Sequence, residues 1–123
     1  MTRCPPSCVQ SFDVPPFKVH VALFETFPQF HECCPEGPDP DEVGLANAAA
    51  LRWQGDGVTW FAMVIPNGLE VPTVAHECSH LVDFILDHCG VPMGVENSEL
   101  RGFLLEFVLS ETLDLLDQRD PHR

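Results

Sequence analysis

The sequence predicts a small α+β domain: an antiparallel or mixed sheet of about three strands, packed on one helix and followed by a second, C-terminal helix. Three observations predict this fold class. The length of 123 residues is that of one domain. Apolar residues make up 45% of the chain, which is enough for a modest core. They alternate with polar residues in the first half and recur at helical spacing in the second half.

The N-terminal segment, residues 1–16, is expected to be an irregular arm because it contains four prolines and two cysteines. We therefore place the single domain at residues 17–118. Its first strand is expected at 17–24, where β-branched and aromatic residues alternate with others. Residues 31–42 contain three prolines and five acidic residues, and they predict a surface loop.

A hairpin is expected in the middle of the chain. Its strands, 46–53 and 58–65, flank the sequence Gln54-Gly-Asp-Gly57. An Asp-Gly pair favours a tight turn because both positions accept a positive φ angle. The strand at 58–65 is almost entirely apolar or aromatic, so we expect it to be buried.

Two helices are expected after the hairpin. The first spans about residues 73–89, where apolar side chains recur at helical spacing, and Gly90 followed by Pro92 ends it. The second begins at Asn97 or Ser98, either of which can cap a helix, and runs to about Asp117. The second helix has an apolar inner face made of Leu100, Phe103, Leu104, Phe107 and Val108.

The charge balance limits the partners. Acidic residues outnumber basic ones by 19 to 6, and the net charge is −13. Such a chain repels phosphate, so we expect no nucleic-acid partner. The apolar stretches fall short of the roughly 20 residues that a membrane span needs, and the N-terminus lacks the apolar segment of a secretory signal. We expect a cytoplasmic protein with no membrane partner; mimicry of DNA is a minor alternative.

The most specific motif is His76-Glu77-Cys-Ser-His80 within the first helix. Histidines four positions apart lie about 40° apart around a helix, so both imidazoles can bind one zinc ion. A glutamate between them can reach a zinc-bound water and act as its general base. The motif therefore predicts a Zn²⁺ site with hydrolytic chemistry. Two surface histidines beside an ordinary glutamate are the alternative.

A catalytic zinc ion needs a third protein ligand. Glu96, Glu99 and Glu106 all follow the motif, on or next to the second helix. A second helix whose first turn crosses the motif helix would bring Glu99 close. Two strictly antiparallel helices would instead place Glu106 level with His80. The residues alone leave this choice open.

A family resemblance narrows that choice. The segment Thr73-Val-Ala-His-Glu-Cys-Ser-His-Leu81 resembles the motif helix of zincin metallopeptidases, and Glu96-Asn-Ser-Glu-Leu-Arg-Gly-Phe-Leu104 resembles the glutamate helix of their gluzincin branch. The chain is also similar to small HExxH proteins encoded by tailed phages and prophages, which implies the cytoplasm of a host cell. The resemblance covers about residues 58–108.

The resemblance implies that His76, His80 and Glu99 are the zinc ligands and that Glu77 is the general base. It also implies that an exposed sheet edge binds the substrate as an added strand, for which the strand at 46–53 is the best candidate. One departure is that Gly102-Phe103 replaces the small residue and tyrosine of the family pattern. The chain contains no tyrosine, so tyrosine cannot stabilise the transition state here.

Other side chains also have candidate roles. Asp83 and Asp87 lie near the histidine face and can orient a ligand imidazole, with solvated carboxylates as the alternative. His31 and His88 are candidate proton donors or ordinary surface histidines. Cys78 falls on the apolar side of the motif helix and is expected to be buried. A second metal site is a further candidate, with unpaired thiols as the alternative; its ligands would be Cys4, Cys8, Cys33 and Cys34.

Two function classes follow. The first is a zinc metallopeptidase, a hydrolase in which activated water attacks a peptide carbonyl while Glu77 takes up the proton. The second is a non-catalytic, zinc-stabilised binding or assembly factor, for example in phage morphogenesis, that keeps the zinc ligands and has no need of Glu77. Both predict a peptide or protein as substrate or partner.

Overall fold

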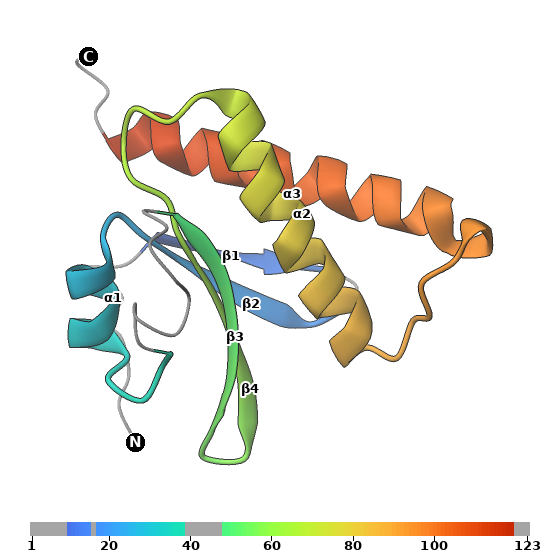
Figure 1. Cartoon of the computed structure of the whole chain (residues 1–123), viewed down its shortest axis with the longest axis horizontal. Coiled ribbons are helices and arrows are strands. Elements are labelled where there is room, and N and C mark those ends of the chain that lie inside the picture. The colour runs from blue at the N-terminus through green and yellow to red at the C-terminus, as the bar shows by residue number, and fades with distance from the viewer. Residues whose placement is uncertain (1–9, 16, 39–47, 120–123) are drawn as a thin grey trace.

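The computed structural model describes residues 10–15, 17–38 and 48–119. Within these ranges the chain forms a mixed four-stranded sheet and three α-helices, which confirms the α+β class. Helices α2 (Val71–His88) and α3 (Ser98–Arg119) lie together on one side of the sheet, and the short helix α1 (Phe27–Cys33) lies apart from them (Figure 1).

The sheet has the order β1-β2-β4-β3, with bounds Gln10–Val14, Val19–Phe24, Val58–Val64 and Ala49–Gly55, respectively. The β1–β2 and β4–β3 pairs are antiparallel, and β2 and β4 are parallel. The β3–β4 hairpin turns at Asp56 and Gly57, whose φ angles of 54° and 75° are both positive, as the Asp-Gly pair predicts. Among the described strands β3 lies at one edge of the sheet, as expected for the strand at 46–53.

Both faces of the sheet are buried. Leu23, Phe61 and Met63 pack with α2 and α3 in the larger core cluster. Alternate positions such as Phe24 and Val64 pack on the opposite side with Phe30 and the cysteines that follow it. Because successive side chains of a strand point to opposite faces, the nearly continuous apolar run of β4 fills both clusters.

Two elements differ from expectation. Strand β1 lies within the segment 1–16, which was expected to be irregular; Phe12 and Val14 alternate with polar residues and are buried. The prolines on either side of this short strand make the segment look irregular, although its apolar and polar residues alternate. Helix α1 (Phe27–Cys33) includes the start of the expected loop 31–42, and it begins where the Thr26 hydroxyl accepts a hydrogen bond from the Gln29 amide.

The two long helices are confirmed. Helix α2 spans Val71–His88 and helix α3 spans Ser98–Arg119, joined through the short 3₁₀ helix η2 (Val95–Asn97). Gly90 has a φ angle of 78°, which suits the end of α2. Helix α2 packs on β3 and β4 with one side and contacts α3 with another, so the sheet and α3 together fix its orientation. In the described part of the chain, none of the helices has the length and apolar character needed to cross a bilayer.

Candidate metal centre

The two histidines of the motif meet on the exposed side of α2. Their Nε2 atoms are 3.1 Å apart, and their ring centroids are 4.6 Å apart. Two nitrogens bound to one tetrahedral zinc ion at about 2.0–2.1 Å are separated by about 3.3 Å. The observed separation is close to that value, and it is also that of a hydrogen bond between the two rings.

Glu77 borders the histidine pair. It lies about 100° around the helix from His76 and about 60° from His80, and its side chain is partly exposed. A carboxylate in that position is reachable by water. Its negative charge also acts on the neighbouring Cys78, where it adds to the increase in the pKa of the thiol.

The structure does not bring Glu99 to the two histidines. Among the described residues, no group of three or more His, Cys, Asp or Glu side chains is arranged to hold a metal ion. Glu99 is exposed in the first turn of α3, and the alternatives Glu96 and Glu106 are exposed as well. The side chain that reaches α2 from this part of α3 is Arg101, which lies about 200° around the helix from Glu99.

Two arginines form hydrogen bonds with the aspartates of α2. Arg101 donates from Nε to Asp83 Oδ1 at 3.0 Å and from Nη2 to Ser79 Oγ at 3.1 Å. Arg52 of β3 donates from Nη1 to Asp87 Oδ2 at 2.8 Å and to the Phe84 carbonyl at 3.0 Å. Both aspartates therefore anchor neighbouring elements to α2, rather than orienting an imidazole as the sequence suggested.

These arginines are the site-related residues that sequence reasoning missed. An arginine in an alternating strand or on a helix is ordinarily a solvent-facing residue, and no local pattern marks its partner. Arg52 and Asp87 are separated by 35 positions in the chain, and Arg101 and Asp83 by 18. The pairings follow from how β3 and α3 pack on α2.

Cys78 is fully buried, as expected. Its Sγ lies 3.7 Å from the Thr112 hydroxyl of α3, and burial raises the pKa of the thiol to about 11. A protonated, enclosed thiol is a poor metal ligand, because thiolate is the form that binds metals. Cys78 therefore serves the α2–α3 contact.

The surface near β3 and the C-terminal half of α2 is hollowed. One cavity of about 390 Å³ is lined by side chains of β3, β4 and the end of α2, among them Trp53 and His88. A second of about 350 Å³ lies between α2 and the Val91–Met93 segment. Arg52 and Asp87 line both cavities, so the ion pair between these two residues separates one cavity from the other.

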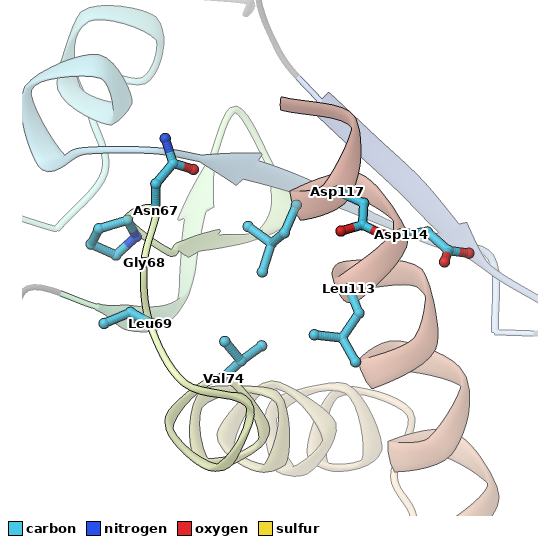
Figure 2. A pocket seen from close by; sticks show the side chains of 9 residues that line it. Asn67, Gly68, Leu69, Val74, Leu113, Asp114 and Asp117 are labelled. Atoms are coloured by element: carbon cyan, nitrogen blue, oxygen red, sulfur yellow. The ribbon is translucent and has the colours of Figure 1, made fainter. Parts of the chain in front are cut away.

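A third cavity lies away from the histidines. It has a volume of about 450 Å³ and lies between the loop after β4, the start of α2 and the C-terminal part of α3. Figure 2 shows Val74 of α2 and Leu113 of α3 facing this space, with Asp114 and Asp117 beside it on α3. Among the described residues, the lining of this cavity includes neither a histidine nor a cysteine side chain.

No protein-family model, curated protein or solved structure matches the chain. The resemblance to zincins therefore depends on the motif residues and on their local geometry.

The remaining candidates are distributed over the fold. Cys33 and Cys34 are buried in the smaller core cluster, while Cys4 and Cys8 lie outside the described residues, so the second metal site stays a prediction. His88 is exposed, with its ring edge-on to Phe61. His31 packs in the same way on Phe30, and its Nε2 is buried with no hydrogen-bond partner among the described residues.

Proposed function

We propose that this protein is a zinc-dependent metallopeptidase-like hydrolase in which His76 and His80 bind the metal ion and Glu77 is the general base. The observation that carries the proposal is the 3.1 Å approach of the two Nε2 atoms on the exposed side of α2. The helix that bears them also packs against β3, an edge strand to which an extended peptide can pair.

The two histidines suit zinc, whereas a third ligand is not in place among the described residues. Two neutral imidazoles are ordinary zinc ligands, and their spacing suits one ion. We propose Glu99 as the third ligand, as the family resemblance implies. Because Glu99 and Arg101 project from opposite sides of α3, ligation by Glu99 requires the first turn of α3 to rearrange and the Arg101–Asp83 pair to loosen.

The chain's own residues would do the following work. A bound zinc ion supplies a Lewis acid that makes water nucleophilic near neutral pH. The Glu77 carboxylate accepts a proton from the attacking water and passes it to the nitrogen of the leaving amine. The backbone of β3 aligns an extended substrate beside α2, and Arg52 holds β3 to that helix through Asp87 and the Phe84 carbonyl.

A second candidate function has an observation in its favour. The described residues include no third ligand at the histidine pair, and both histidines are exposed. When two imidazoles hold a zinc ion, a side chain of another protein can complete its coordination. The protein would then be a non-catalytic binding or assembly factor, consistent with the similarity to small phage-encoded proteins.

The Glu77→Gln variant separates the two functions. Glutamine keeps the shape of the side chain and removes its basicity. If the protein is a hydrolase, we expect the variant to keep its zinc content. The zinc-loaded variant should cleave a denatured protein or a peptide library at least a hundredfold more slowly than the wild type does. Cys89→Ala, at an exposed position away from the motif, is the control. Full cleavage by Glu77→Gln would exclude the general-base role, and wild-type protein that binds zinc without cleaving any substrate would favour the binding factor.

A further inference from the structure

The start of α3 carries large exposed apolar side chains. Phe103 is 68% exposed and Leu100 is 36% exposed; they lie three positions apart and so are neighbours on the helix surface. Met93 and Val95, in the connection that leads into α3, are 68% and 88% exposed. All four belong to one short segment, which we call the 93–103 surface.

This segment projects from the body of the protein. In Figure 1 the N-terminal part of α3, in orange, extends past the strands, and α2 crosses α3 nearer its middle. Helix α3 buries Leu104 and Val108 on its inner side, so apolar residues lie on two sides of the same helix. The sequence pattern assigned Leu100 and Phe103 to the inner face. The structure leaves Phe103 largely exposed, and Leu100, about 40° around the helix from buried Leu104, lies partly exposed at the edge of the inner side.

Acidic side chains border the apolar residues. Glu96, Glu99 and Glu106 are exposed, and none forms an ion pair with a described residue. Arg101, the basic residue of the segment, is paired with Asp83 on the inner side. The surface is thus apolar with a negative border.

We propose that the 93–103 surface binds a partner protein through a segment that combines apolar side chains with lysine or arginine, such as a basic amphipathic helix. Opposite charge at the border lowers the energy of such a complex and speeds its formation. A second copy of this chain would bring Glu96, Glu99 and Glu106 against the same residues, on top of a net charge of −13 for each copy. Charge therefore favours a basic partner over self-association. The proposal needs neither zinc nor catalysis, but it shares Glu99 with the hydrolase proposal.

The test uses a synthetic helical peptide with leucines on one face and lysines beside them. Its binding to the full chain is measured by fluorescence anisotropy at physiological salt. We expect saturable binding that weakens at least tenfold in the Leu100→Ser/Phe103→Ser double variant. Val58→Ser is the matched control, since Val58 is 49% exposed at the hairpin, and it should leave the affinity unchanged. Glu106→Lys should weaken binding severalfold.

Two control peptides separate specific docking from charge attraction. A peptide with serines in place of the leucines should bind at least tenfold more weakly, and one with glutamates in place of the lysines should not bind. Equal binding of the serine peptide, or an affinity that the double variant leaves unchanged, would overturn the proposal. A wild-type dimer in light scattering that becomes a monomer in Phe103→Ser would also overturn it, because the occupant would then be a second copy.

Discussion

Arg101 Nε lies 3.0 Å from Asp83 Oδ1, in an ion pair that ties the start of α3 to α2 only three positions beyond His80. The guanidinium also reaches the Ser79 hydroxyl, one position before that histidine. The pair therefore holds α3 at the part of α2 that carries the proposed metal ligands. It also holds the first turn of α3 in the orientation that directs Glu99 to solvent.

The Arg101–Asp83 pair should contribute modestly to stability. Both side chains are about one-third exposed, at 32% and 36%, so solvent screens their attraction. We expect Arg101→Met and Asp83→Asn each to lower the free energy of unfolding by about 1 kcal/mol. The double variant should lose little more than either single variant. Urea unfolding of the four proteins measures this coupling, and fully additive losses would show that the pair does not act as a unit.

Glu99 can be tested against its neighbour on the same helix. If Glu99 is the third ligand, Glu99→Gln should weaken zinc binding at least tenfold, because the neutral amide is a poorer ligand than the carboxylate. Glu106→Gln removes another exposed carboxylate, seven positions further along α3, and should change the zinc affinity little. Competition with a chromogenic zinc chelator measures both affinities. Equal affinities for the two variants would remove Glu99 from the ligand set.

Arg101 and Glu99 should have opposite effects on the affinity for zinc. Because the Arg101–Asp83 pair holds the turn with Glu99 pointing outward, Arg101→Met should tighten zinc binding while it lowers the stability of the zinc-free protein. The same chelator competition, combined with urea unfolding in excess EDTA, measures both quantities. Weaker zinc binding in Arg101→Met would contradict the proposed rearrangement and would indicate that the observed helix orientation is the metal-binding one.

The cysteines of α2 and its C-terminal end should differ in reactivity. Cys89 is exposed, whereas Cys78 is fully buried with a thiol pKa raised to about 11. Iodoacetamide at pH 8 should therefore modify Cys89 in the native protein and leave Cys78 unmodified until the chain unfolds. Peptide mapping by mass spectrometry reads each site separately. Modification of Cys78 at the rate of Cys89 would show that the α2–α3 contact opens readily.

The long helices and the hairpin could be predicted because their signals are local. The Asp56-Gly57 turn and the helical spacing of apolar residues in 73–89 fix structure over a few residues each. Strand β1 is short and is followed by prolines, which make this part of the sequence look irregular. The sequence pattern therefore gives no sign that β1 pairs with β2. Helix α1 lasts only seven residues, too few for a clear periodic pattern.

The candidate site could be predicted only in its helical part. His76 and His80 lie on one helix, so their approach follows from the helical repeat alone. The third ligand depends on how α3 is rotated about its own axis, and no local pattern determines that rotation. The same rotation exposes Phe103, which the apolar pattern assigned to the core, and turns Arg101 toward Asp83.

The central claim is that His76 and His80 bind zinc together. The most direct test is the metal content of the purified protein after exposure to equimolar zinc and removal of the free ion, for the wild type and for His80→Ala. His88→Ala, on the same helix, is the matched control. The proposal expects about one zinc per chain in the wild type and in His88→Ala, and none retained by His80→Ala. No zinc in the wild type, or the same zinc content in His80→Ala, would contradict it.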